Sequence, residues 1–247
     1  MKERQNIIFS ILTEKPKVTV KELSDRLLVS EVTIRKDLSQ MENDGIIKRI
    51  HGGAAQISSE SIEKRMLIRY NEKLKLAKEA VKLMKDGETI LIEAGSTNSV
   101  FARELAEHRE VNIITNSLYI AGLMKSYQNV QVTVLGGNLQ NDAQAMVGPL
   151  AKLALSQLCV SKAFIGMSGF TESLGFTCTD FLRAEIGREM SLRAQEVIVI
   201  AEAAKFDQIG MTSIVELDKV STVITEKEIA EDKLKVLMKH NIQTLLI

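Results

Sequence analysis

Long apolar runs and cysteines are both scarce in this chain of 247 residues. No stretch approaches the roughly 20 uninterrupted apolar residues of a membrane-spanning helix, so we expect no membrane partner. Residues 1–6 are polar and no apolar signal region follows them, so we expect no signal peptide. Cys159 and Cys178 are too few for a disulfide framework, which favours the reducing cytoplasm. We expect two ordinary thiols; a redox pair between them is the alternative.

Histidine and net charge are scarce as well. His51, His108 and His240 lie far apart and have no Cys, His or Asp neighbours at ligand spacing, so we expect no metal site. The 32 Lys and Arg residues balance 32 Asp and Glu residues. Residues 1–57 hold ten basic against eight acidic residues, a weak excess, whereas clustering of the basic residues at 35–36 and 48–49 is more informative.

The first 57 residues carry apolar side chains at helical spacing. They predict a first helix over residues 5–13, which ends before Pro16. Thr19 and Glu22 have the spacing of a capping box, which marks the start of a second helix. The residues of the second helix that we predict to be buried are Leu23, Leu27 and Leu28.

A third helix is predicted over residues 31–43, with Ser30 as its cap. Gly45 suits a left-handed turn after it, and residues 46–50 read as a strand before a hairpin reversal at 52–53. The inner face of the third helix is predicted to hold Ile34, Leu38 and Met41. Two closely joined helices followed by a basic hairpin indicate a winged helix-turn-helix domain over residues 1–57.

The third helix and the hairpin carry side chains suited to DNA. Arginine pairs with guanine or phosphate, and hydroxyl groups bind phosphate or base edges. The basic hairpin would reach the flanking backbone or the minor groove. The predicted DNA-binding residues are Ser30, Glu31, Thr33, Arg35, Lys36, Ser39, Lys48, Arg49 and His51. The alternative is a winged helix used for protein contact, with the basic residues forming a solvated face.

The remainder of the chain, residues 58–247, has a different pattern of apolar and polar residues. Residues 58–75 are polar and of mixed charge, and we predict a linker that becomes a connecting helix. Over residues 76–247, apolar strands alternate with turns and helices, which predicts an α/β domain with a doubly wound, mostly parallel sheet. The predicted strands are 89–92, 111–114, 130–135, 163–166, 197–201, 221–224 and 244–247, with a helix before each of 163–166, 197–201 and 221–224.

Three of these strands end in small or polar turns, at residues 95–97, 115–117 and 136–137. In an open parallel sheet, ligands bind at the carboxyl ends of the strands. A Gly-Ser-Thr turn that leads into a helix offers backbone N–H groups and the positive end of the helix dipole to an anion. The turns therefore predict an anion site at one edge of the sheet.

Two motifs resemble those of the DeoR family of bacterial repressors. Residues 29–38 read VSEVTIRKDL and residues 45–54 read GIIKRIHGGA, similar to the family patterns VS-x-x-TIRRDL and G-x-x-x-R-x-HGGA. Lys36 stands where the family usually has a second Arg, which keeps the charge but loses bidentate geometry.

The resemblance continues into the second domain, through Glu93-Ala94-Gly95-Ser96-Thr97 and the motifs at 115–117, 135–137, 164–166 and 202–206. It implies a fold similar to ribose 5-phosphate isomerase and a phosphorylated sugar as effector, with its phosphate on the 95–97 turn. The implied effector-binding residues are Glu93, Gly95, Ser96, Thr97, Thr115, Asn116, Ser117, Gly136, Gly137, Gly166 and Lys205. Glu93 and Glu202 stand where the family more often has Asp, and we expect both to contact effector hydroxyls.

The predicted function is repression of a sugar-metabolism operon, with DNA affinity controlled by a phosphorylated sugar or related metabolite. Operator symmetry implies a homo-oligomer, a dimer or a tetramer, paired through the connecting helix near 61–75. The alternative is an isomerase-like enzyme with an accessory DNA-binding domain, in which Glu93 and Glu202 would move protons. Because residues 166–169 read GMSG rather than an Asp-rich turn typical of the isomerases, we expect no catalytic residue and no cofactor. Activation instead of repression is left open.

Overall fold

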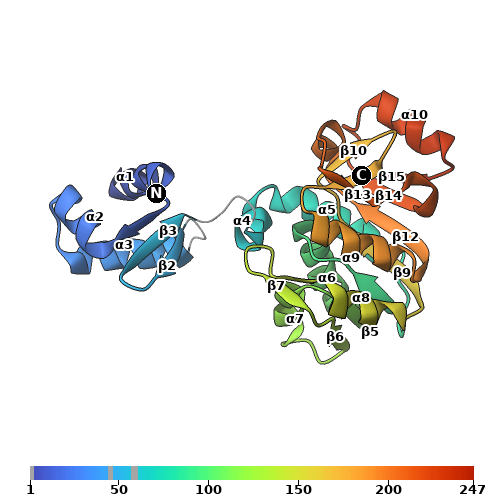
Figure 1. Ribbon diagram of the computed structural model, residues 1–247, viewed down its shortest axis with the longest axis horizontal. Helices are drawn as coiled ribbons and strands as arrows, with labels where there is room; N and C mark the ends of the chain where they lie inside the picture. The colour runs from blue at the N-terminus through green and yellow to red at the C-terminus, as the bar shows by residue number, and fades with distance from the viewer. Residues whose placement is uncertain (1–2, 44–46, 57–60) are drawn as a thin grey trace. The chain divides into compact units, whose positions relative to one another are not determined.

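The computed structural model describes residues 3–43, 47–56 and 61–247, and the chain divides into two compact units, Met1–Ile68 and Arg69–Ile247 (Figure 1). Each unit has its own hydrophobic core. In the described part of the chain, no helix is both long enough and apolar enough to cross a membrane.

The N-terminal unit is a helix-turn-helix with a small antiparallel sheet. Its elements are α1 (Glu3–Glu14), β1 (Lys17–Thr19), α2 (Val20–Leu27), α3 (Glu31–Asn43), β2 (Ile47–Ile50) and β3 (Gly53–Gln56). The sheet has the order β1-β3-β2. The capping box of α2 is present, since Glu22 N donates to Thr19 Oγ1 at 3.1 Å and Thr19 N donates to Glu22 Oε2 at 2.7 Å. Ile34, Leu38 and Met41 are fully buried on the inner face of α3, as predicted.

Strand β1 is an element that the sequence pattern did not predict. It pairs with β3 beside Gly53, where a Cβ atom would lie 2.1 Å from the carbonyl oxygen of Val18. Only glycine allows the two strands to approach this closely. Gly53, the second glycine of the hairpin, is therefore required for β1 to pair with β3.

The prediction that Leu28 is buried is wrong. Helix α2 ends at Leu27, and Leu28 adopts the left-handed conformation (φ 55°), which leaves its side chain 91% exposed. Leu23 is buried and Leu27 half-buried. Gly45 and Ile46, for which a turn and a strand start were predicted, lie outside the described residues.

The connecting helix expected near residues 61–75 is two helices. Helix α4 (Ile62–Leu67) is capped by Ser61, and α5 (Tyr70–Val81) begins after Arg69. Arg69 has a positive φ of 52°, which a continuous helix does not allow. The chain therefore turns sharply at the first residue of the C-terminal unit.

The C-terminal unit confirms the predicted doubly wound α/β fold. Its main sheet has seven strands in the order β15-β14-β12-β9-β4-β5-β6, and every pair is parallel. The strands are β4 (Thr89–Ile92), β5 (Val111–Thr115), β6 (Val130–Val134), β9 (Val160–Ile165), β12 (Ala194–Ile200), β14 (Thr222–Thr225) and β15 (Gln243–Leu246).

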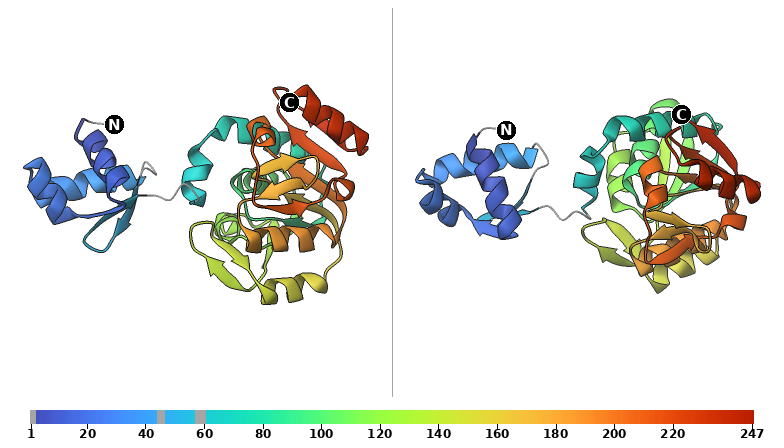
Figure 2. Two further views of the ribbon diagram at one scale, coloured as in Figure 1. Left: turned by 45° about the horizontal axis from the view of Figure 1, so that its top comes forward. Right: turned by 90° about the horizontal axis from the view of Figure 1, so that it is seen from above.

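Helices cover both faces of this sheet. Helices α5 and α6 lie on one face and α8 and α9 on the other (Figure 2). The helices are α6 (Ser96–His108), α7 (Leu118–Met124), α8 (Pro149–Ser156), α9 (Phe181–Ser191) and α10 (Glu231–Lys239). The central strands are buried on both sides, which explains their continuous apolar sequences.

Short elements around the main sheet were not predicted. They are β7 (Asn138–Gln140), β8 (Ala145–Val147), β10 (Gly169–Thr171), β11 (Gly175–Cys178) and β13 (Thr212–Val215), with two 3₁₀ helices, η1 (Ala203–Asp207) and η2 (Leu217–Lys219). The helix expected before the strand at 221–224 is wrong, because only the single turn η2 precedes it. Phe170, Phe176 and Phe206 join these elements through ring contacts of 5.3 to 6.4 Å. Runs of three or four residues are too short to show a period of their own.

Candidate functional site

The outward face of α3 carries most of the predicted DNA-binding residues. Glu31, Arg35, Lys36 and Ser39 are exposed on α3, and Thr33 is half-buried. Ser30 caps the helix, since Thr33 N donates to Ser30 Oγ at 3.3 Å and the two hydroxyl groups lie 2.9 Å apart. The N-terminus of the helix is thereby fixed, while the face beyond it stays open to a ligand.

Arg35 forms an ion pair with Glu31 one turn earlier, at 2.8 Å. Both side chains are about half exposed, and exposed pairs of this kind contribute roughly 0.3–0.5 kcal/mol. Such a weak pair does not prevent Arg35 from turning to a base or a phosphate. Glu31 thus lies beside Arg35, the side chain of this helix that we expect to read a base.

Arg49 of the hairpin packs against α3. Its guanidinium donates to Ser39 Oγ at 3.2 Å, to the carbonyl oxygen of Arg35 at 3.3 Å, and to that of Gly53 at 3.3 Å. Its backbone N–H donates to Glu42 at 3.0 Å. Arg49 and Ser39 therefore join the hairpin to the helix, while Lys48 and His51 remain exposed on the hairpin.

A further pair, which sequence reasoning missed, joins α1 to α3. Arg4 Nε lies 2.5 Å from Asp37 Oδ2, and Asp37 is only 6% exposed. The hydrogen bond to Asp37 raises the pKa of Arg4. No local signal marks this contact, because the two residues lie far apart in the sequence. It fixes the orientation of α3 on the body of the unit.

In the C-terminal unit, the predicted effector residues lie at the carboxyl ends of five adjacent strands. The strands run β12-β9-β4-β5-β6, and parallel pairing brings their carboxyl ends to one edge. The segments that follow them are 202–205, 166, 93–97, 115–117 and 136–137, in that order. The structure therefore brings the predicted segments together, although they span more than a hundred residues of sequence.

The 95–97 turn begins α6. Gly95 is the N-cap, no side chain within the described residues caps this end, and Ser96 and Thr97 lie in the first turn. Buried Glu93 accepts a hydrogen bond from Gly166 N at 3.2 Å. A Cβ atom on Gly166 would lie 3.3 Å from the Glu93 carboxylate, so this approach depends on a small residue.

A buried ionic cluster lies beside this turn. Glu202 pairs with Lys73 at 2.8 Å and with Lys205 at 3.3 Å, and Thr97 Oγ1 donates to it at 3.4 Å. The Lys73 and Glu202 side chains are only 3% and 7% exposed. Burial acts to raise the pKa of Glu202, but Lys205 and Lys73 lower it to about 2.

Lys73 is a member of the cluster that sequence reasoning missed. It lies on α5 and is buried together with Leu76, Ala77 and Ala80. A lysine on the apolar stripe of a helix is the signal that would have marked it, since lysine is almost never fully buried without a partner.

The side chains at 115–117 are occupied by protein partners. Thr115 Oγ1 donates to the carbonyl oxygen of Ile92 at 2.6 Å, and Ser117 Oγ accepts from Ile120 N at 3.1 Å. Asn116 accepts from Ala94 N at 2.9 Å and donates to the carbonyl oxygen of Met146 at 3.1 Å. All three are fully buried or nearly so. They hold β4, β5 and β8 together, and so support the edge rather than present side-chain groups to it.

The two glycines after β6 differ. Gly137 has a φ of 141°, and a Cβ atom there would lie 2.5 Å from the carbonyl oxygen of Val147. Gly137 is therefore required for the packing of β8. Gly136 has no heavy atom within 4 Å of a Cβ position, so it leaves open space beside the edge.

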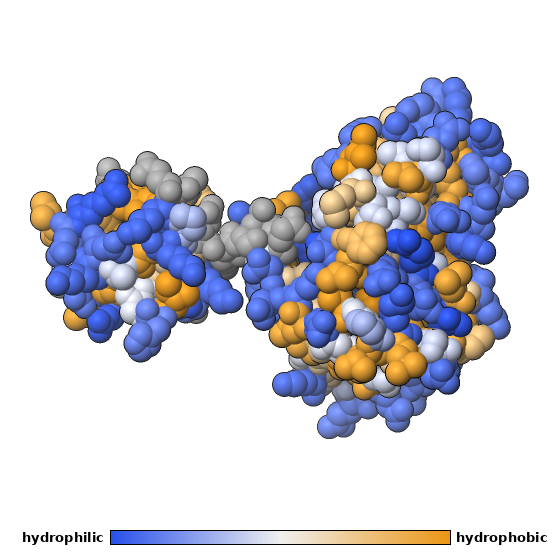
Figure 3. All heavy atoms as spheres, in the orientation of Figure 1, coloured by the Kyte–Doolittle hydropathy of each residue, from blue (hydrophilic) through white to orange (hydrophobic). Residues whose placement is uncertain are grey.

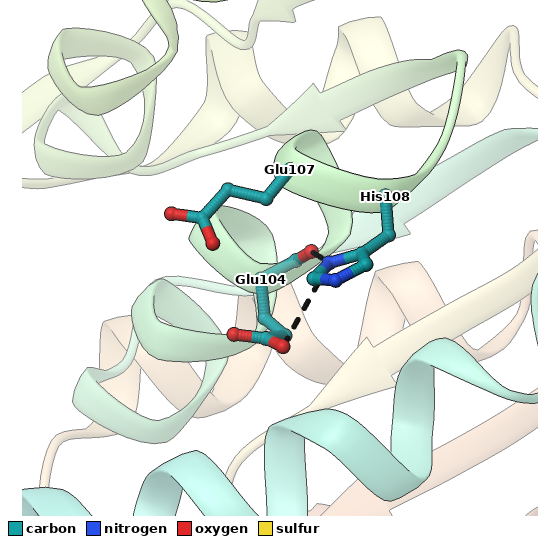
Figure 4. Close-up of side chains that lie close together, drawn as sticks. All are labelled: Glu104, Glu107 and His108. Atoms are coloured by element: carbon teal, nitrogen blue, oxygen red, sulfur yellow. Dashed lines mark hydrogen bonds and ion pairs between the residues drawn. The ribbon is translucent and has the colours of Figure 1, made fainter.

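Metal-ligating side chains gather at the other end of α6. Glu104, Glu107 and His108 place ligand atoms within 4.8 Å of one another (Figure 4). His108 Nδ1 lies 2.8 Å from the carbonyl oxygen of Glu104, within the last turn of the helix. Along the helix axis these residues lie roughly 12 to 18 Å from Ser96, at 1.5 Å per residue. Because exposed acidic groups of this kind are common without an ion, we assign it no role.

Comparison with known proteins gives two family matches. Residues 4–60 match the DeoR-like helix-turn-helix domain, and residues 68–227 match the DeoR C terminal sensor domain. The HTH-type transcriptional regulator GolR of Listeria innocua is 33% identical over 231 residues, covering 92% of this chain and 91% of the relative. The lactose phosphotransferase system repressor of Lactococcus lactis is 32% identical over 243 residues, covering 95% and 94%.

Among solved structures, ribose 5-phosphate isomerase A of Methanocaldococcus jannaschii is 26% identical, with a TM-score of 0.41. The match covers 56% of this chain and 54% of the isomerase.

Proposed function

Because the chain belongs to the DeoR family of DNA-binding transcriptional regulators, we propose that it represses a sugar-metabolism operon and that a phosphorylated sugar or related metabolite controls its DNA affinity. The names of its relatives are those of regulators rather than enzymes. One of them, the lactose phosphotransferase system repressor, names a sugar system, and another is a putative aga operon transcriptional repressor of Escherichia coli.

Activation is the second possibility that an observation favours. The L-fucose operon activator of Haemophilus influenzae is 25% identical over 250 residues and matches the whole chain. Whether a regulator represses or activates depends on where the operator lies relative to the promoter. The same helix-turn-helix domain is therefore compatible with repression and with activation.

One observation carries the ligand proposal. The N-terminus of α6, which no side chain of the described residues caps, lies beside the cluster of Glu202 with Lys73 and Lys205. The first turn of α6 offers backbone N–H groups and the positive end of the helix dipole. Thr97 of this turn donates to Glu202, which is itself held by Lys73 and Lys205. A phosphate at the turn would find hydrogen-bond donors from the backbone and, at Lys205, a partly exposed ammonium group.

Binding there would reach the start of the C-terminal unit. An anion that attracts Lys205 weakens its pairing with Glu202, and Glu202 is the partner of Lys73 on α5. Arg69, at the turn before α5, pairs with Glu226 at 2.5 Å, and Glu226 accepts a hydrogen bond from Ala203 N at 2.9 Å. The Lys73–Glu202 ion pair thus joins the 202–205 segment to α5 directly, and the Arg69–Glu226 pair joins it through the hydrogen bond from Ala203. A ligand that favours one arrangement of this segment changes DNA affinity by its difference in affinity between the two states.

The test is DNA binding by the full chain to its own upstream region, measured by fluorescence anisotropy at fixed salt. Phosphorylated sugars and their unphosphorylated parents are titrated in parallel. We expect one phosphorylated compound to change the DNA affinity at least fivefold, the lower end of ordinary coupling, while its parent does not. If no phosphorylated compound shifts binding, or if the parent acts equally, the proposed effector class is wrong.

Lys205→Met tests the site itself. Because Lys205 lies in the C-terminal unit, we expect this variant to keep its ligand-free DNA affinity and to lose the response. Lys235→Met is the matched control, since Lys235 is 71% exposed and pairs only with Glu231 within α10 among the contacts of the described residues. An unchanged response in Lys205→Met would remove Lys205 from the ligand site.

A further inference from the structure

Helix α3 exposes an apolar side chain in its first turn, on its polar face. Val32, the second residue of α3, is 72% exposed. It contributes little to the core, which takes Ile34, Leu38 and Met41 from the opposite side of the same helix. Single exposed apolar residues are ordinary on protein surfaces, so the position of Val32 carries the inference rather than its exposure.

Val32 lies at the end of the helix that reads DNA. In helix-turn-helix proteins, the N-terminal residues of the second helix of the motif contact base edges in the major groove. Val32 is one turn from Lys36 on the same face, and both line a groove of about 540 Å³ between α1 and α3. The other residues that line this groove are Arg4, Gln5, Thr33, Asp37 and Gln40. A branched apolar side chain therefore projects from surroundings that are otherwise polar or charged.

The charges around Val32 indicate what it meets. Arg35 and Lys36 follow it on the helix, Lys48 lies on the hairpin, and all three are exposed. The face of the N-terminal unit that Figure 3 shows is mainly hydrophilic. The occupant of this face is a polyanion, and the apolar group that DNA presents in its major groove is the C5-methyl group of thymine.

We propose that Val32 is a specificity-determining residue that packs against the methyl group of one thymine in each operator half-site. This methyl group is read by apolar contact rather than by hydrogen bonding, and a short branched apolar side chain can supply that contact. The polar neighbours would fix the helix on the backbone, and Val32 would select T·A at a single base pair. The proposal depends on the DNA-binding activity of the family and needs no effector.

The experiment removes the methyl group and nothing else. A binding site is selected from a random duplex library with the full chain, and each thymine of that site is then replaced singly by uracil. Burial of one methyl group is worth about fourfold in affinity. We expect wild-type protein to bind about fourfold more weakly when one particular thymine of a half-site becomes uracil, and Val32→Ala to lose most of this difference.

Two further variants separate base reading from general DNA contact. Lys36→Ala should weaken binding to the thymine and uracil duplexes alike, because it loses a charge and no methyl contact. Leu28→Ala is the matched apolar control, since Leu28 is 91% exposed in the turn before α3, and it should keep the discrimination at that base pair.

The proposal is overturned if the selected site holds no thymine at which uracil weakens wild-type binding. It is equally overturned if Val32→Ala retains the full difference between thymine and uracil. Binding of Val32→Ala to non-specific duplex, equal to that of wild type, excludes a folding defect as the cause of lost discrimination. Unequal non-specific binding would itself contradict a role confined to one base pair.

Discussion

At the scale of single residues, Lys73 and Glu202 form a deeply buried ion pair in the C-terminal unit. A buried ion pair adds little net stability over an apolar pair, but loss of one partner leaves an uncompensated charge and typically costs 3–5 kcal/mol. The pair therefore constrains which states the 202–205 segment can adopt. Both carboxylate oxygens of Glu202 have partners: Oε1 pairs with Lys73, and Oε2 pairs with Lys205 and accepts a hydrogen bond from Thr97.

The pH dependence of stability follows from Glu202. Its pKa in the folded chain is about 2, below the ordinary value of 4.5, so the charged form is favoured by folding. Its contribution is fully present above pH 4.5 and is lost as the pH falls from 4.5 towards 2. We expect the free energy of urea unfolding, measured for wild type at several pH values, to fall in this window, and to fall less steeply in Glu202→Gln.

Glu196→Gln is the control for this measurement, because Glu196 is an exposed residue of β12. It should preserve the wild-type slope below pH 4.5. Equal slopes in wild type and Glu202→Gln would mean that Glu202 is not held in its charged form.

At the scale of elements, the sequence was most informative where periodicity and caps agree. The capping box at Thr19 and the inner face of α3 were predicted correctly, as were the seven strands of the main sheet, within a few residues. Leu28 was mispredicted because periodicity does not show where a helix stops, and a left-handed residue turns its side chain outwards. The break in the predicted connecting helix was missed for the same reason, because periodicity does not show that Arg69 has a positive φ.

The candidate site was predictable only in part. Turns at strand ends mark the edge of a parallel sheet, so the segments around Gly95 and Gly136 could be identified locally, whereas Gly166 was indicated only by the family resemblance. The roles of Asn116 and Lys73 could not, because each depends on partners that lie far away in the sequence. A sequence pattern reports which side chains are present, whereas their hydrogen-bond partners are decided by the packing of the whole unit.

The hairpin of the N-terminal unit gives a prediction at this scale. Gly53→Ala places a Cβ atom 2.1 Å from the carbonyl oxygen of Val18, so β1 and β3 must separate. We expect a loss of at least about 2 kcal/mol in the unfolding free energy of this unit, beyond the usual effect of a substitution, and a loss of DNA binding. Thermal unfolding followed by circular dichroism and fluorescence anisotropy with DNA measure the two effects.

Gly52→Ala is the matched control. Gly52 has a φ of 73° but no heavy atom within 4 Å of a Cβ position, so only backbone strain of about 1–2 kcal/mol applies. If Gly52→Ala proved the more damaging of the two, close approach of the strands would not be the reason for Gly53.

At the scale of the whole molecule, a helix-turn-helix regulator that reads a symmetric operator needs at least two copies of its reading helix. We expect sedimentation equilibrium at micromolar concentration to show a dimer or a larger assembly, and titration with an operator duplex to give two chains for each site. A strictly monomeric chain under these conditions, with one chain for each duplex, would contradict the proposed homo-oligomer.

The two separate hydrophobic cores have a consequence for inheritance. Leu38 belongs to the core of the N-terminal unit and Ile165 to that of the C-terminal unit, so mutations in each core are judged by selection largely on their own. Under the proposed function, a lineage can thus exchange the metabolite it responds to by altering the short turns around Gly95 or Lys205, while its genomic targets stay the same. The reverse exchange, through α3 alone, leaves the chemistry of the response intact. Duplicated copies of such a gene can therefore change their DNA target or their effector independently of each other.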